Sequence, residues 1–93
     1  MKIVYKDTFV LRLEKQLKYV SENNPKSARE LKIELIKKIK EIPENPYLFR
    51  KSIYFENDLI RDLIYKGYTV VFRINEHQIE IFGFTRFQEN PTD

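Results

Sequence analysis

Residues 59–74 constrain the fold more than any other part of the chain. Apolar and β-branched residues fill two runs there, separated by Lys66-Gly67, and a third run follows the polar stretch Asn75-Glu76-His77-Gln78. Runs of this kind, bounded by turn-forming residues, are typical of β-strands joined by hairpins. The pattern therefore predicts a three-stranded antiparallel meander that ends near Arg86.

A two-residue turn at Glu76-His77 would fix the register of the last two strands, because it sets which residues oppose each other. The pairs on one face would be Asn75–Gln78, Arg73–Glu80, Val71–Phe82 and Thr69–Phe84, and those on the other Ile74–Ile79, Phe72–Ile81 and Val70–Gly83. The second face is predicted to meet the helices. The first carries Phe82, Phe84 and Arg86, which suits either a bound molecule or a partly exposed sheet face whose charges cover their neighbours.

Arg61 poses a separate problem in the first strand of the meander. A two-residue turn at Lys66-Gly67 would place it opposite Phe72, on the helix side of the sheet. Either its guanidinium is then buried against a helix carboxylate, or the turn is longer and the register flips. The sequence leaves both arrangements open.

Two amphipathic helices are predicted before the meander, after a short strand at Ile3-Val4-Tyr5. Asp7 or Thr8 is placed to cap the first helix, which runs to about Glu22. Its apolar stripe consists of Phe9, Val10, Leu13, Leu17 and Val20. Asn23-Asn24-Pro25 ends this helix, since proline disfavours helical geometry in the residue before it.

The second helix is predicted to begin at Pro25 or Ser27 and to end at Pro43-Glu44-Asn45-Pro46. Its stripe consists of Ala28, Leu31, Leu35, Ile39 and Ile42, and Ile33 falls outside it. The connection that follows, to about Asn57, is rich in large apolar residues. It either folds back onto the core or presents a surface to a partner. The tail at 89–93 is predicted to be disordered.

Composition limits the class of protein. A chain of 93 residues predicts one domain, residues 1–93, with a single modest core. It has no Cys and one His, and no apolar run long enough to span a bilayer, so we expect a cytoplasmic protein without metal or cofactor. Residues 1–40 hold eleven Lys/Arg against five Asp/Glu, whereas the remainder holds six against nine. This basic helical half suits nucleic acid or an acidic partner, or simply keeps the outer helix faces in water.

Few catalytic classes fit these residues. His77 lies at a predicted hairpin tip, which makes a nucleophile–His pair implausible, and the two glycines do not form a phosphate-binding loop. RNA cleavage by cations and tyrosine remains, because such groups stabilise the charge on phosphate and shuttle protons. The candidate catalytic residues for a nuclease are Tyr65, Lys66, Arg73 and Arg86.

The element order, together with Arg61 and the run Gly67-Tyr68-Thr69-Val70-Val71-Phe72-Arg73, resembles the RelE/ParE superfamily of bacterial toxins. The resemblance implies an α+β fold with a short N-terminal strand and a two-helix hairpin on a three- to four-stranded, mainly antiparallel sheet. It also implies the toxin of a type II toxin–antitoxin module, of the kind associated with plasmid stabilisation. The implied partner is a cognate antitoxin, and DNA would be bound only through the complex of the two proteins.

The resemblance favours the ParE-like branch, whose members are known to poison DNA gyrase. The RelE-like ribosome-dependent nucleases have an Arg where this chain has Thr69, which argues against cleavage of mRNA. Their basic C-terminal segment is also reduced here to residues 86–91. The residues expected to bind the target or the antitoxin are Arg61, Arg73, Phe82, Phe84 and Arg86. The alternatives are an endoribonuclease that acts on ribosome-bound mRNA and a degenerate, non-toxic member.

Overall fold

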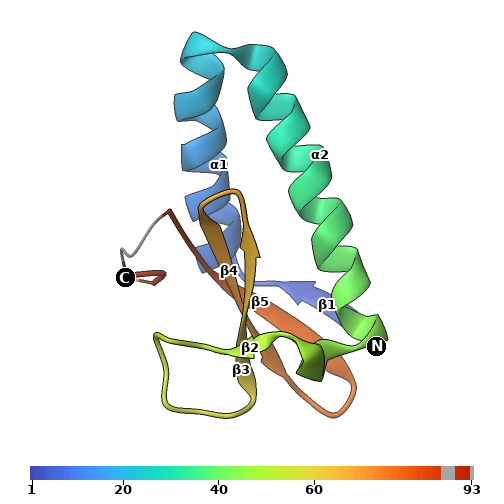
Figure 1. Ribbon diagram of the computed structural model, residues 1–93. Coiled ribbons are helices and arrows are strands. Elements are labelled where there is room, and N and C mark those ends of the chain that lie inside the picture. Colours follow the sequence, from blue (N-terminus) through green and yellow to red (C-terminus); the bar gives the residue numbers. More distant parts are fainter. Residues whose placement is uncertain (87–89, 93) are drawn as a thin grey trace.

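The computed structural model describes residues 1–86 and 90–92. Two antiparallel helices pack on one face of a five-stranded mixed sheet of order β1-β5-β4-β3-β2 (Figure 1). The elements are β1 (Lys2–Tyr5), α1 (Asp7–Asn23), α2 (Pro25–Glu41), the 3-10 turns η1 (Ile42–Glu44) and η2 (Pro46–Leu48), β2 (Arg50–Lys51), β3 (Ile60–Tyr65), β4 (Tyr68–Ile74) and β5 (Gln78–Arg86). The α+β fold agrees with the sequence prediction. The fifth strand is the two-residue β2, which is too short for a periodic signal.

The helix boundaries depend on one asparagine. Asn24 ends α1 and then caps α2, because its side-chain oxygen accepts a hydrogen bond of 3.1 Å from the Ser27 backbone N–H. Pro25 is the first residue of α2, where its missing N–H costs nothing. The predicted cap of α1 was wrong: Lys6 precedes the helix and makes no side-chain cap bond. Asp7 lies in the first turn of the helix, where its negative charge interacts favourably with the positive end of the helix dipole.

The core lies between the helices and the sheet, and it follows the predicted stripes. From α1, α2 and the start of η1 it takes Phe9, Leu13, Leu35, Ile39 and Ile42. From the sheet it takes Leu63, Tyr68, Val70, Phe72, Ile74, Ile79, Ile81 and Phe84. Ile33, which falls outside the stripe, is 65% exposed. Burial of apolar surface stabilises the fold by about 25 cal/mol per Å². It therefore determines which face of each helix packs on the sheet.

The register of β4 and β5 is correct near the turn and wrong beyond it. Arg73, Phe72 and Ile74 oppose the predicted residues of β5, but a register shift follows between Val71 and Phe72. From there Val71 opposes Gly83, Val70 opposes Phe84 and Thr69 opposes Thr85, so the predicted pairs Val71–Phe82, Thr69–Phe84 and Val70–Gly83 do not form. The physical reason is a β-bulge, which adds one residue to β5 and turns the following side chains to the other face.

The bulge moves Phe84 from the predicted open face to the core. Its ring is 3% exposed and lies 5.4 Å from Tyr68 and 6.0 Å from Phe9, centroid to centroid. Phe82 stays on the face away from the helices, half-buried against Phe55 at 5.5 Å. The two phenylalanines therefore do not form one patch.

The connection between α2 and β3 is both packed and exposed. Phe49 packs on Phe72 at 5.4 Å, whereas Tyr47 and Leu48 are exposed. Asp62 on β3, with 2% of its surface exposed, holds the next part of the connection. Its Oδ2 accepts hydrogen bonds from Arg50 and from the backbone N–H of Ile53. Phe49 thus folds back onto the core, as one interpretation of this segment predicts, whereas Tyr47 and Leu48 form the exposed surface of the other.

The C-terminal residues that the structure describes are ordered by the sheet. Pro91 is fully buried, and its carbonyl accepts a hydrogen bond of 3.2 Å from the Phe84 backbone N–H. The predicted disorder was therefore wrong for residues 90–92, while residues 89 and 93 lie outside the described part of the chain. Among the described residues, no helix is long and apolar enough to cross a membrane.

Candidate functional site

Arg61 ties the connection to the sheet. It does lie opposite Phe72, as the two-residue turn predicts. Its partners, however, are backbone carbonyls and not a helix carboxylate: it donates to Asp58 at 2.8 Å, Phe49 at 3.0 Å and Tyr47 at 3.3 Å. The guanidinium also lies over the Tyr47 ring, 5.2 Å from its centroid. These contacts assign Arg61 a structural role, and its contact with a target stays a prediction.

The β3–β4 turn presents Tyr65 and Lys66. Lys66 and Gly67 both have positive φ, 48° and 82°, which matches the twist of a tight hairpin. Two ammonium groups lie near the ring of Tyr65: Lys38 Nζ is 5.5 Å and Lys66 Nζ 5.4 Å from the ring centroid. Cations near an aromatic face are attracted by its negative quadrupole. The sequence did not indicate Lys38, because its contact with Tyr65 joins segments far apart in the chain.

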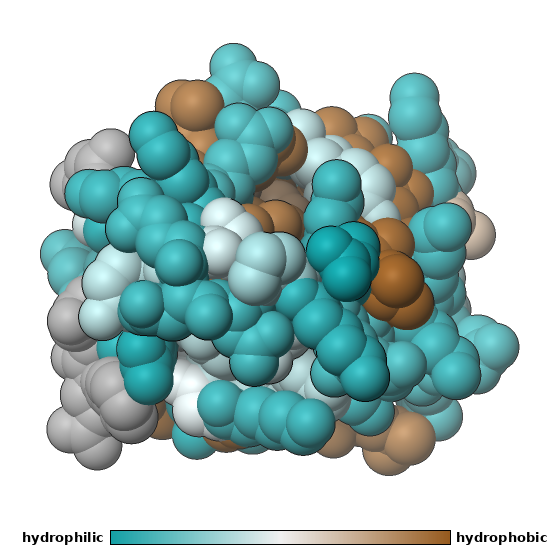
Figure 2. All heavy atoms as spheres, turned by 90° about the horizontal axis from the view of Figure 1, so that it is seen from above, coloured by the Kyte–Doolittle hydropathy of each residue, from teal (hydrophilic) through white to brown (hydrophobic). Residues whose placement is uncertain are grey.

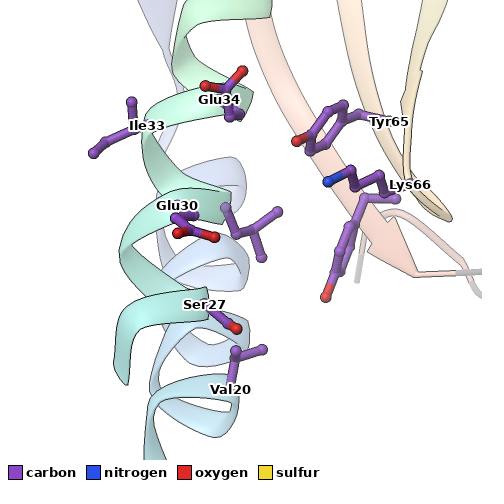
Figure 3. Close-up of a pocket in the computed structure, with 9 residues that line it drawn as sticks. Val20, Ser27, Glu30, Ile33, Glu34, Tyr65 and Lys66 are labelled. Atoms are coloured by element: carbon purple, nitrogen blue, oxygen red, sulfur yellow. The ribbon is translucent and has the colours of Figure 1, made fainter. Parts of the chain in front are cut away.

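A cleft of about 660 Å³ separates this turn from the helices (Figure 3). Glu30 and Glu34 of α2 line one wall, and Tyr65 and Lys66 line the other. Apolar side chains, among them Val20, line its interior. The cleft thus combines an apolar interior with opposite charges on its two walls, which suits a polypeptide segment better than a uniformly charged ligand.

Arg86 lies at the same end of the sheet, beside a second groove. Its guanidinium is 5.9 Å from the centroid of Tyr68, the residue it opposes on β4. The groove has a volume of about 550 Å³ and runs between α1 and the end of β5. Its lining includes Leu11, Arg12, Lys15, Tyr19, Phe84 and Arg86. Leu11 and Tyr19 are exposed, so cations and exposed apolar groups alternate along it.

Arg12 and Gln16 anchor α1 beside this groove. Arg12 donates a hydrogen bond of 2.7 Å to the Phe84 carbonyl, and Gln16 donates one of 3.2 Å to the Tyr68 hydroxyl. Neither residue was a candidate from sequence. Both residues lie at the edge of the apolar stripe of α1, and this position could have indicated that they contact the sheet. Long polar side chains at such positions pack along the core and reach neighbouring elements with their polar ends.

A third groove, of about 420 Å³, lies between the two helices and is lined mainly by apolar side chains. Its lining includes Tyr5, Val10, Leu17 and Ile36. Burial raises the pKa of the Tyr5 phenol, because the charged form loses hydration there. Figure 2, which views the molecule from the side of the α1–α2 turn, shows a largely hydrophilic surface with apolar atoms in the gaps between polar side chains.

Arg73 lies at the opposite end of β4 from Arg86. It opposes Glu80 as predicted, but the Glu80 carboxylate accepts hydrogen bonds from Asn75 and Gln78 instead. Five residues separate Arg73 from Tyr68 along the strand, a distance of about 16 Å. The four candidate nuclease residues therefore split: Tyr65, Lys66 and Arg86 share one end of the sheet, and Arg73 is at the other. They do not converge on one phosphate.

Thr69, which the sequence resemblance set against an Arg of the RelE-like nucleases, is buried in the sheet. It is 5% exposed, between Ile64 of β3 and Thr85 of β5. Among the described residues, no group of three or more His, Cys, Asp or Glu is placed to hold a metal ion. The surface thus offers cations, tyrosines and open grooves at one end of the sheet.

Fold and grooves together define a small α+β protein whose helical hairpin covers one face of a mixed sheet. The family model of the ParE toxin of the type II toxin-antitoxin system, parDE, matches residues 3–90, and the chain belongs to this family. A solved structure from the chromosomal ParDE toxin-antitoxin system of P. aeruginosa is similar, with a TM-score of 0.78. The similarity covers 95% of this chain and 97% of that one at 14% identity, so it shows a shared fold. No curated protein matches the sequence.

Proposed function

We propose that this chain inhibits bacterial growth by binding and poisoning DNA gyrase, and that a cognate antitoxin neutralises it. The observation that carries the proposal is the family match over residues 3–90. A cytoplasmic site of action belongs to the same proposal, because gyrase is a cytoplasmic enzyme. A role in plasmid stabilisation belongs to it as well, because it is associated with toxin–antitoxin modules of this kind.

The grooves beside the helical hairpin support an antitoxin partner. The groove beside Arg86 has exposed apolar groups, Leu11 and Tyr19, between cations, and the groove between the helices is mainly apolar. An amphipathic segment with acidic residues would bury these apolar groups and pair with the cations. We therefore expect the antitoxin to cover the surface that includes Arg86.

Two observations support binding of a target over cleavage of RNA. Thr69, which the sequence resemblance aligns with an Arg of the nuclease branch, is uncharged and buried. Arg73 is at the far end of β4 from Arg86, so the cations do not surround one reacting phosphate. Because electrostatic stabilisation of the transition state depends on position, such a dispersed set would contribute little.

One observation favours a second candidate function, the cleavage of ribosome-bound mRNA. Tyr65 and Lys66 lie at the same end of the sheet as Arg86. A nuclease would use Lys66 and Arg86 to stabilise the phosphate and Tyr65 to move a proton. A non-toxic family member is the third outcome that the experiments below distinguish.

The first experiment is induced expression with and without the neighbouring gene. We expect growth arrest with this chain alone and normal growth when both genes are expressed. Plasmid loss with and without the gene pair tests the stabilisation role. Normal growth at full expression of folded protein alone would contradict the toxin proposal.

The second experiment separates the targets with purified protein. Gyrase and supercoiled DNA in one tube should accumulate cleaved DNA, while mRNA on translating ribosomes in another should stay intact. Arg86→Ala should weaken the gyrase effect, whereas Lys2→Ala, an exposed change on the edge strand β1, should not. Cuts at defined codon positions that disappear with Arg86→Ala would overturn the gyrase proposal and favour the nuclease.

A further inference from the structure

The outer face of α2 carries a row of cations with no ion-pair partner in the described part of the chain. Lys26, Arg29, Lys37 and Lys40 are all exposed, and none lies within 4.0 Å of a carboxylate there. At 100° per residue, these four and Ile33 fall within roughly 80° of one another. Ile33, which is 65% exposed, lies at the edge of the cleft that Glu30 and Glu34 also line (Figure 3). Two acidic residues of α2, Glu30 and Glu34, thus line the cleft, and the stripe of four cations lies beside them on the outer side of the helix, with Lys40 at the edge of the groove between the helices.

The cations of this face differ in how they affect the stability of the helix. Lys26 lies in the first turn, which contains no acidic residue, although the helix dipole disfavours cations there. Lys26 with Arg29, and Lys37 with Lys40, are like-charge neighbours three residues apart, and such pairs repel. Two opposite charges lie within reach along the helix, Glu30 four residues from Lys26 and Glu34 three residues from Lys37, yet neither forms a salt bridge. Lys40 lies in the last turn, where the helix dipole favours a cation. The cations of this face therefore stay available to an external anion.

We propose that this outer face of α2 binds the phosphate backbone of duplex DNA. The four cations extend over fifteen residues of helix, from Lys26 to Lys40, a rise of about 21 Å, which suits a rigid, regular polyanion. A single exposed apolar residue, Ile33, is too little for the core of a protein interface. The helix has no aromatic residue on which unpaired bases would stack, so single strands fit less well.

The inference differs from the expectation that only the antitoxin complex contacts DNA. It rests on the proposed function in one respect: a toxin that poisons gyrase acts where that enzyme holds DNA. The basic face of α2 would contribute affinity for the DNA segment, while the grooves beside the hairpin stay available to protein. The contact is electrostatic and independent of base sequence.

The test is fluorescence anisotropy of a labelled 24-base-pair duplex with the purified chain at several salt concentrations. For about four phosphate contacts, the slope of log K against log salt should be about −3.6. Arg29→Glu with Lys37→Glu should weaken binding at least about tenfold at low salt and reduce the slope to about −1.8. Arg29→Gln with Lys37→Gln, which introduces no repulsion, should give the same slope with a smaller loss.

The matched control is Lys2→Glu with Lys51→Glu, which changes the net charge equally at the two edges of the sheet. We expect it to bind within about threefold of the original chain, since phosphate contacts act locally. Equal loss in both double variants, no binding of the original chain, or tighter binding to single-stranded RNA or polyglutamate would each overturn the inference. Growth arrest by a chain that does not bind DNA would leave the toxin proposal intact and remove only this one.

Discussion

The two ends of the β4–β5 hairpin are stabilised in different ways. At the turn, Glu80 accepts hydrogen bonds from Asn75 and Gln78, and His77 is almost fully exposed. At the other end, Phe84 is buried against α1, and Pro91 packs closely over Gly83. On the face toward the helices both ends are buried, Ile74 and Ile79 at the turn and Phe84 at the other end, so the two ends differ on the opposite face. There water can replace the hydrogen bonds of Glu80, but it cannot replace the packing over Gly83. The difference teaches that the end nearest the grooves depends on close packing on both faces of the sheet, whereas the turn end is so packed on one face.

Phe84→Ala should have the largest effect. Removal of this buried ring should cost about 3–5 kcal/mol, because it leaves a cavity beside Phe9 and Tyr68. Urea denaturation measures the loss. The matched change Phe82→Ala, in a half-buried ring at the bulge, should cost clearly less. Equal losses would mean that packing does not distinguish the two faces of β5.

Gly83→Ala should destabilise the same end by about 1–3 kcal/mol, as overpacking does. A Cβ at this position would lie 3.0 Å from Val71 Cβ and 3.3 Å from Val71 Cγ2. The control is a double-mutant cycle with Val71→Ala, which removes Cγ2 and should relieve part of the strain. Strict additivity of the two changes would show that the close approach is not the cause.

Arg12→Ala should cost about 1.5 kcal/mol, the usual contribution of a hydrogen bond from a charged group. The change removes the donor to the Phe84 carbonyl and loosens α1 at the bulge end. Thermal unfolding gives the comparison with Lys15→Ala, a neighbour in the same groove, which should have little effect. A neutral Arg12→Ala would place the stability of this end in the side-chain packing alone.

Arg73→Ala should have the smallest effect on stability, about 0–0.5 kcal/mol, because exposed charges contribute little. Arg73 is exposed, and Glu80 takes its hydrogen bonds from other residues. If Arg73 contacts the target, growth inhibition should fall while the melting temperature stays constant. A large melting shift with intact toxicity would make Arg73 purely structural.

The sequence predicted the parts of this fold that repeat a period. Stripes in α1 and α2 gave the helices and their buried faces, and the two-residue turn gave the pairs from Ile74 to Phe72. The prediction failed at the bulge, because an extra residue breaks the alternation on which any extrapolation depends. Gly83 was the available sign, since a glycine inside a strand often marks a bulge.

The candidate site was harder to predict, because its parts meet only in three dimensions. Arg61 was correctly identified as a residue that needs partners, but those partners are carbonyls of an irregular connection without periodicity. Arg73 and Arg86 were grouped by charge, although the strand separates them. The contact of Lys38 with Tyr65 depends on how α2 packs, which no local pattern encodes.

The parallel pairing of β1 with β5 has a consequence for the order of folding. Lys2 pairs with Gln78 and Tyr5 with Ile81, so β1 can pair only after β5 has been synthesised. Pairing of segments so far apart in the sequence is slow, because the two ends of the long intervening chain must first be brought together. During translation, the helical hairpin therefore forms well before the sheet is complete. A nascent chain cannot present a finished end of β5, so the growth inhibition proposed above would begin only once synthesis has passed Arg86.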